Sequence, residues 1–250
     1  GGPMNAIEAT RNLCDDYYCT DGLPIDKSPL FKGKTGKAAY DKDHPDFARY
    51  ENRDPRLKGT LFVPGMKWLN DTYDYDKTTN PDGKPIPSHS QVAIMKWFVP
   101  ENMANEYDGS LDYYVIRYAE VLLSLSEAMI EKGGYSQDQI TKYINEVRQR
   151  VNMPKVEDVE GKGLSQEQLR QIVRHERRVE LAFEDLRFAD LYRWGEWKNA
   201  VERMNKEFET YGAGDYERSY RGAQDEVWPI PQNEIDTDKN LKQHKEWGGE

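Results

Sequence analysis

One segment of this chain places charged side chains on the face that a helix normally buries. Between residues 169 and 194, apolar residues recur with a period of about 3.6 residues, and Ile172, Val173 and Phe183 fall within roughly 60° of Leu169 on a helical wheel. Four further residues lie within about 20° of the centre of the same stripe, namely Glu176, Glu180, Arg187 and Trp194. A buried carboxylate is costly unless it is paired and hydrogen-bonded, so the segment predicts a buried network of acidic and arginine side chains.

The predicted members of this structural ion network are Glu176, Arg177, Glu180, Arg187, Asp190 and Arg193. An alternative interpretation is a glycosidase, because Glu176, Glu180 and Glu184 repeat every four residues and paired carboxylates cleave glycosidic bonds. Carboxylates of that kind face each other across a cleft, whereas these three share one packed stripe. The structural interpretation is therefore favoured, and no catalytic residue is predicted.

Composition restricts the possible functions further. The formal net charge of −10 repels phosphate backbones, which argues against nucleic-acid binding. No apolar run approaches the roughly 18 residues that a membrane span needs. The hydrophobic fraction is only 37%, but 12% of the residues are aromatic, which is not typical of a disordered chain. We expect a folded, polar protein with long loops that carry aromatic side chains.

Turn signals divide the chain into two parts of one expected domain. Residues 1–110 are rich in Gly and Pro and contain short strand patterns at 60–63 and 92–99. Residues 111–250 are expected to be helical, beginning with a helix over 112–131 that ends at a Gly-Gly pair. The predicted fold is mainly α, with tetratricopeptide-like helical hairpins and a long loop-rich segment that carries a few short strands.

Two capping boxes mark further helix starts. Ser136 with Gln139 opens a helix expected to run to about residue 151, which completes a helical hairpin. Ser165 with Gln168 opens the charged helix. A short helix is expected within 195–215, and the proline-rich segment 227–231 is expected to be extended.

Metal and cofactor binding have little support in the sequence. None of the four histidines has ligand spacing to another, and His175 lies off the core stripe, as expected of a solvated or helix-edge residue. Cys14 and Cys19 are permitted to form a disulfide outside the cytoplasm, but this needs a tight turn. The segment 74–83 contains calcium-type oxygen ligands in the wrong order, so it is interpreted as a turn. No metal site and no cofactor are predicted.

A polar loop rich in aromatic residues is the predicted ligand-binding site. Its members are Trp68, Asn70, Asp71, Tyr73 and Tyr75, which combine flat apolar rings with hydrogen-bonding side chains. The alternative is that Trp68 covers a local core and that the tyrosines are ordinary surface residues. The other tryptophans are expected in the core, at positions Trp97, Trp194, Trp197, Trp228 and Trp247.

The charged segment also resembles a known family. Residues 176–194 match the pattern E-R-R-x-E-L-A-F-E-G-x-R-F-x-D-L-x-R-W of the RagB/SusD family, the surface glycan-binding lipoproteins of Bacteroidetes. Asp185 stands where that family usually has Gly, so a tighter or shifted turn is expected there. Four other segments resemble family elements in the same order: D-G-x-P-I at 21–25, N-R-D-P-R-L at 52–57, R-x-A-E-V-L-L at 117–123 and a closing P-I-P-x-x-E-I strand at 229–235.

The resemblance implies a function for a longer protein. Family members are about twice this length and begin with a signal peptide and a lipidated cysteine, so the chain is interpreted as the C-terminal part, with the N-terminal half absent. The implied protein is an outer-membrane lipoprotein at the cell surface that binds polysaccharide or oligosaccharide. It would deliver this ligand to a SusC-like TonB-dependent porin without breaking a bond, so it would not be an enzyme. Two alternatives remain: a peptide or glycopeptide ligand, or a scaffold that docks the porin without contacting ligand.

Overall fold

The computed structural model describes residues 9–40, 46–68, 71–72, 92–97, 112–211 and 218–249. The chain forms two compact units, Gly1–Arg187 (unit 1) and Phe188–Glu250 (unit 2). The compositional division expected near residue 110 stays a prediction. Within the described residues, no helix has both the length and the apolar character that a membrane span requires.

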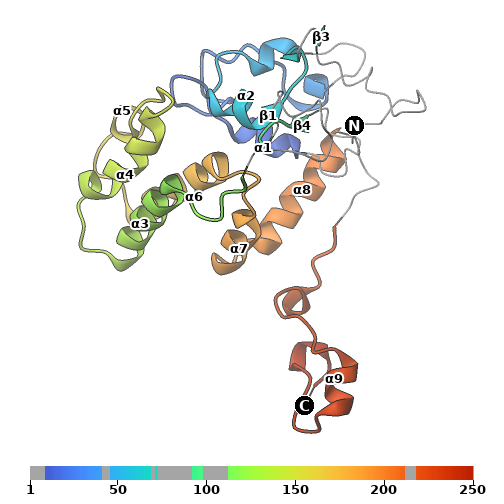
Figure 1. Cartoon of the computed structure of the whole chain (residues 1–250). Coiled ribbons are helices and arrows are strands. Elements are labelled where there is room, and N and C mark those ends of the chain that lie inside the picture. Colours follow the sequence, from blue (N-terminus) through green and yellow to red (C-terminus); the bar gives the residue numbers. More distant parts are fainter. Residues whose placement is uncertain are drawn as a thin grey trace. The chain divides into compact units, whose positions relative to one another are not determined.

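A bundle of helices forms the C-terminal part of unit 1 (Figure 1). Helix α3 (Tyr118–Lys132) packs against α4 (Gln137–Gln149) and against α6 (Gln166–Glu180), while α5 (Val156–Glu160) follows α4. The core between them is aliphatic and includes Leu123, Ile130, Ile144, Val156 and Val173. This arrangement confirms the mainly α fold and the helical hairpin predicted from the sequence.

Both predicted capping boxes are present. Ser136 Oγ accepts from the backbone N–H of Gln139 at 3.3 Å, and the Gln139 side chain accepts from the Ser136 N–H at 2.9 Å. Ser165 and Gln168 make the same reciprocal pair at 3.2 and 2.9 Å. Gly133 ends α3 with φ = 72°, a conformation that glycine adopts without steric cost. The helix starts and the end at Gly133 are therefore determined by local sequence.

The start of α3 differs from the prediction. The helix begins at Tyr118, six residues later than expected, because Arg117 has extended backbone (φ −136°, ψ 161°). Ile116, which the periodicity placed on the buried face, is 71% exposed. The guanidinium of Arg117 is bound by Glu180 and Glu184, so a distant ion pair and not local periodicity determines this boundary.

The charged segment is not one continuous helix, which corrects the helical-wheel interpretation beyond residue 180. Helix α6 ends at Glu180, and a separate helix α7 (Leu186–Arg193) follows. Phe183 and Asp185 between them have φ of 61° and 59°, which a continuous right-handed helix does not allow. Asp185 therefore adopts the left-handed conformation at the position where the family pattern has Gly, and Asp tolerates it better than most residues.

The loop-rich N-terminal part of unit 1 contains short elements. These are α1 (Arg11–Asp16), η1 (Gly36–Tyr40), η2 (Phe47–Tyr50), α2 (Arg56–Thr60), β1 (Leu61–Phe62), β2 (Lys67–Trp68), β3 (Asp71–Thr72) and β4 (Ala93–Ile94). The two predicted strand segments are confirmed in shorter form, and they pair with each other antiparallel as β1 and β4. A second core joins this part to α6, with Tyr17, Leu57 and Leu61 packed alongside Val179. Cys14 and Cys19 are both buried, and no disulfide joins them.

Unit 2 begins within α7 and continues through α8 (Trp197–Tyr211), η6 (Gly222–Asp225), α9 (Gln232–Thr237) and η7 (Lys245–Trp247). Residues 227–231 contain no strand, and 232–237 are helical, which corrects the expected closing strand. Pro229 and Pro231 lack the N–H that a ladder requires, and Pro231 instead precedes the first turn of α9.

Candidate functional site

Arg56 lies at the centre of the buried charges around α6. Its Nη1 donates to Glu176 Oε1 at 2.5 Å and to Glu180 Oε2 at 3.0 Å, and its Nη2 donates to Asp54 Oδ2 at 2.6 Å. Arg148 Nε, from α4, donates to the second oxygen of Glu176 at 2.8 Å. Guanidinium groups thus satisfy both oxygens of the Glu176 carboxylate, which makes its burial tolerable.

A second group of ion pairs closes the end of α6. Arg117 donates from Nε to Glu184 Oε2 at 2.6 Å and from Nη1 to Glu180 Oε1 at 2.7 Å. Lys96 donates to the Glu184 carboxylate and to the backbone oxygens of Glu180 and Ala182, at 3.2 and 3.0 Å for the two oxygens. These contacts join the residues after β4, the residue before α3 and the turn after α6.

The pKa values follow from this arrangement. Burial alone would raise the pKa of Glu176, but the Arg56 and Arg148 guanidiniums outweigh it and lower that pKa to about 2. Burial also opposes ionisation of Glu180, and Arg56 and Arg117 again lower its pKa. Burial lowers the pKa of Lys96 although Glu184 opposes that shift. The glutamates are anions at neutral pH and are held as structural partners.

The structure places the other predicted network residues separately. Arg177 Nη1 donates to Ser124 Oγ at 3.0 Å, and its Nε lies 3.8 Å from Glu127. Arg193 pairs with Asp190 at 2.8 Å, and Arg187 is half-buried. The partners of Glu176 and Glu180 described above come from other segments. Adjacent residues on a helix do not face each other, so Arg177 and Glu176 point in different directions.

Sequence reasoning did not name Arg56, Arg117 or Arg148. Arg56 ends the R-D-P-R part of segment 52–57, and Arg117 begins segment 117–123. Both segments match elements of the family pattern, so the sequence marks these two arginines. The pattern does not indicate which carboxylate each arginine contacts. That information resides in the tertiary arrangement.

His175 is half-buried and packed against Tyr18, which fits the helix-edge alternative and not a fully solvated histidine. Its ring stacks on Tyr18 with the centroids 3.9 Å apart, and Nε2 lies 2.7 Å from the backbone oxygen of Asp16. Desolvation lowers its pKa, so the ring is neutral at pH 7. The contact attaches α6 to the end of α1, and the histidine has a structural role.

Three exposed or half-exposed aromatic residues form a surface cluster in unit 1, named here the aromatic platform: Trp97, Tyr113 and Tyr114. The Trp97 and Tyr113 rings stack with centroids 5.0 Å apart and planes 25° apart, and Tyr114 lies 5.0 Å from Trp97 at 46°. Both tyrosines are exposed. Trp97 is half-buried, which corrects its expected place in the core.

The platform is held by the turn between α6 and α7. Trp97 Nε1 donates to the backbone oxygen of Phe183 at 2.9 Å, and Tyr113 Oη donates to Asp185 Oδ2 at 3.0 Å. Trp97, Phe183 and Asp185 all have positive φ, which is unusual for non-glycine residues and is often found at functional sites. Desolvation and the hydrogen bond to Asp185 raise the pKa of Tyr113, so its hydroxyl stays protonated and donates. Ordered rings with fixed hydrogen-bonding groups suit a ligand that has both a flat apolar face and hydroxyls.

The predicted aromatic loop is only partly described. Strands β2 and β3 pair antiparallel, and their register places Trp68 opposite Asp71. Asn70, Tyr73 and Tyr75 lie outside the described residues, as does the segment 74–83 that was interpreted as a turn. The backbone therefore brings two of the five predicted residues together at a hairpin.

Among the other tryptophans, Trp228 is 86% exposed, which corrects its expected place in the core, while Trp194, Trp197 and Trp247 are half-buried. Within the ranges that the structure describes, no group of three or more His, Cys, Asp or Glu side chains is placed to hold a metal ion.

Comparison with known proteins identifies the family. The model of the SusD family matches residues 1–247, so the chain belongs to the SusD family, as its motifs indicated. A SusD-like protein, P2, of Formosa agariphila is 30% identical over 142 residues, which cover 55% of this chain and 26% of that protein.

Solved structures show the same fold. A SusD-like carbohydrate-binding protein from Bacteroides fragilis is 28% identical, with a TM-score of 0.65 over 93% of this chain and 48% of its own. A second SusD-like protein from that species is 23% identical, with a TM-score of 0.65 over 95% of this chain and 46% of its own. The chain thus spans about half the length of these structures. The first of them is described as a carbohydrate-binding protein, and the prediction that this chain is not an enzyme agrees with that description.

Proposed function

We propose that the chain is part of a cell-surface protein that binds polysaccharide or oligosaccharide and delivers it to a SusC-like TonB-dependent transporter in the outer membrane. Membership of the SusD family and similarity to a carbohydrate-binding protein support this proposal. In the full-length protein, a lipid anchor would attach it to the outer membrane. The step is binding and transfer, with no bond broken.

The aromatic platform is the observation that carries the proposal. Aromatic faces pack against the C–H face of a sugar ring, and Tyr113 and Asp185 supply a hydroxyl and a carboxylate at its edge. The proposed contacts also include the residues of the predicted aromatic loop, Trp68, Asn70, Asp71, Tyr73 and Tyr75.

The buried glutamates argue against hydrolysis at this surface. Glu176, Glu180 and Glu184 are each less than 10% exposed and bound to arginine or lysine side chains. A glycosidase needs its carboxylates on either side of a sugar, with one of them protonated. These three carboxylates are instead paired in the folded protein, Glu176 with Arg56, Glu180 with Arg117 and Glu184 with Lys96.

Tryptophan fluorescence of this chain, titrated with a panel of plant, host and microbial polysaccharides, tests the proposal. We expect saturable quenching by at least one polysaccharide, weakened by Trp68→Ala and by Trp97→Phe. Trp228→Phe, in unit 2, is the matched control and should leave the affinity for a neutral polysaccharide unchanged. Quenching that survives in both unit 1 variants would contradict a glycan site at the platform and the predicted loop, and no response from a folded sample would contradict a glycan site in this chain.

A specific observation also favours the scaffold alternative. Tyr118, Val121 and Leu125 occupy one face of α3 at helical spacing and are 66%, 51% and 41% exposed. An apolar helix face of this kind suits a protein contact. If the chain acts only as a scaffold, Val121→Ser with Leu125→Ser in the full-length protein will weaken transporter binding while Trp68→Ala leaves ligand binding unchanged.

A further inference from the structure

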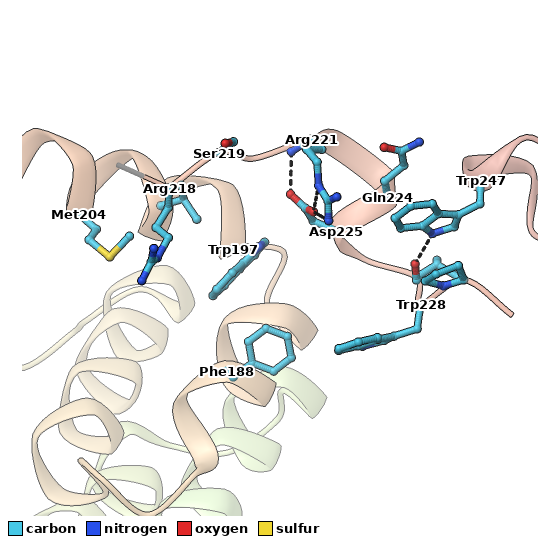
Figure 2. Close-up of a pocket in the computed structure, with 13 residues that line it drawn as sticks. Phe188, Trp197, Met204, Arg218, Ser219, Arg221, Gln224, Asp225, Trp228 and Trp247 are labelled. Carbon is cyan, nitrogen blue, oxygen red and sulfur yellow. Dashed lines mark hydrogen bonds and ion pairs between the residues drawn. The ribbon is translucent and has the colours of Figure 1, made fainter. Parts of the chain in front are cut away.

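A pocket of about 800 Å³ lies within unit 2 and is not part of the platform or the hairpin. Figure 2 shows the rings of Phe188, Trp197 and Trp228 gathered around one open space, with Met204 at its far side. Phe188 and Trp197 meet edge to face, with centroids 5.0 Å apart and planes 76° apart. The Trp228 ring is 86% exposed, so most of its face is available to a ligand.

Hydrogen bonds between side chains and backbone groups position one wall of this pocket. Trp247 Nε1 donates to the backbone oxygen of Val227 at 2.6 Å. The Gln243 side chain bonds both the N–H and the oxygen of Ile230, at 3.0 and 2.9 Å. These three contacts fix the residues on either side of Trp228. The aromatic ring is therefore presented by an ordered segment although the ring itself is exposed.

The opposite wall is attached to α8. Asn205 Nδ2 donates to the backbone oxygen of Arg218 at 2.7 Å, and Asn205 Oδ1 accepts from the Arg218 N–H at 2.9 Å. Both backbone groups of Arg218 are thus satisfied, and its side chain lines the pocket (Figure 2).

The charge of the lining is positive. Arg221 is neutralised by Asp225, which its Nε meets at 2.7 Å, and this pairing lowers the pKa of the Asp225 carboxyl. Arg218 has no acidic partner within the part of the chain that the structure describes. In a protein of net charge −10, a guanidinium that meets no carboxylate among the described residues and lies beside aromatic walls is a specific feature. Guanidinium groups recognise carboxylates and sulfates through paired N–H donors.

We propose that this pocket binds a sugar ring that carries an acidic substituent, a carboxylate or a sulfate. The ring would stack on Trp228, and Arg218 would pair with the acidic group. The volume falls in the range of small-ligand pockets and accommodates one or two sugar rings. The inference rests on the proposed function, since it assigns a second and charge-selective subsite to a carbohydrate-binding protein.

Isothermal titration calorimetry of this chain with three tetrasaccharides tests the proposal. The probes are tetragalacturonate, the same tetrasaccharide with its carboxyl groups reduced to hydroxymethyl groups, and a sulfated galactan tetrasaccharide. We expect an acidic probe to bind at least about tenfold more tightly than the reduced one. Comparison of the two acidic probes then identifies the substituent as carboxylate or sulfate.

Variants locate the binding. Trp228→Ala should weaken the acidic probe at least about tenfold, in the range found for central aromatic contacts. Arg218→Gln should abolish the preference for the acidic over the reduced probe, whereas Arg218→Lys should retain part of it. Arg170→Gln, an arginine of unit 1 paired with Glu131, is the control and should change neither affinity.

Three results would overturn the inference: equal affinity for the acidic and reduced probes, unchanged binding in Trp228→Ala, or unchanged selectivity in Arg218→Gln. If Trp228 in the full-length protein without ligand is protected from acrylamide quenching, another segment of protein fills the pocket, and the inference is also wrong. The proposed function is tested separately with the double variant Tyr113→Ala, Tyr114→Ala. This variant should weaken the binding of neutral glycans at the platform and leave the unit 2 pocket unchanged.

Discussion

In unit 1, Glu176 and Glu180 of α6 are buried and paired with arginines, whereas in unit 2 the pocket includes the exposed aromatic side chains of Phe188 and Trp228. In unit 1, Arg56, Glu176 and Glu180 join segments more than a hundred residues apart in the sequence. In unit 2, the pair Arg221–Asp225 is local, and its guanidinium is largely exposed. Charge therefore supports the fold in unit 1, whereas in unit 2 we propose that it serves ligand recognition through Arg218.

Because of this difference, substitutions in the network should change the stability of the fold, whereas substitutions in the pocket should change ligand binding. Removing a partner from a buried pair leaves an uncompensated charge, so the network should be sensitive to single substitutions. An exposed aromatic ring contributes little to folding, so the pocket should tolerate substitution without loss of stability. The following predictions test that contrast, from the largest expected effect to the smallest.

Arg56→Met should have the largest effect. It leaves Glu176, Glu180 and Asp54 without their common partner and should lower the free energy of unfolding by roughly 3–5 kcal/mol. Urea unfolding followed by circular dichroism measures this. Arg150→Ala is the control, because this side chain is 56% exposed although it also meets Glu180, and it should cost less than about 1 kcal/mol. Equal losses in the two variants would contradict the importance of burial.

Gly22→Ala should come next. Gly22 has φ = 82°, and a Cβ there would lie 2.6 Å from Val159 Cγ2 and 2.9 Å from Pro154 Cγ. Strain and overpacking together should cost roughly 2–4 kcal/mol. Gly161→Ala has a similar φ of 78° but open space around it, so it should cost only about 1 kcal/mol. The difference between the urea unfolding midpoints of the two variants measures the cost of the close contact at Gly22. Equal midpoints would show that a Cβ at Gly22 makes no such contact.

Acid should weaken unit 1 through the network. The pKa of Glu176 is lowered from 4.5 to about 2 in the folded state, and that of Glu180 is lowered too. A group with a depressed folded pKa contributes stability above its unfolded pKa and loses it as pH falls towards its folded pKa. The free energy of unfolding should therefore fall between about pH 4.5 and pH 2. Glu176→Gln should show a smaller slope in that window, and an unchanged slope would refute its role.

Trp228→Ala should have the smallest effect on stability, within about 0.5 kcal/mol, because its ring is exposed. The contrasting variant in unit 1 is Trp97→Phe, which loses the hydrogen bond to Phe183 and should cost about 1 kcal/mol. Thermal unfolding followed by circular dichroism compares them. A larger loss in Trp228→Ala than in Trp97→Phe would reverse the comparison.

Features encoded locally were predictable from the sequence. The capping boxes at Ser136 and Ser165 and the end of α3 at Gly133 each depend on residues within one turn, and all three are as predicted. The presence of buried acidic residues was visible because Glu176 and Glu180 share the helical phase of Leu169.

Features that depend on distant contacts were not predictable. The late start of α3 follows from the pairing of Arg117 with Glu180 and Glu184, which are more than sixty residues away in the sequence. The break after Glu180 interrupts an otherwise helical pattern. The family's Gly at the position of Asp185 signalled a turn, but helical periodicity did not show that Phe183 and Asp185 adopt left-handed backbone and divide the segment into two helices. The exposure of Trp228 depends on what packs around it, which hydrophobicity alone does not indicate.

The claim that glycan binding resides on the aromatic platform can be tested directly with one double variant. The measurement is the affinity of Tyr113→Ala, Tyr114→Ala for the neutral polysaccharide that the wild-type chain binds most tightly, determined by calorimetry beside thermal unfolding. We predict an unchanged unfolding midpoint, because both side chains are exposed, and an affinity reduced at least about tenfold. A folded double variant that binds with wild-type affinity would contradict the account.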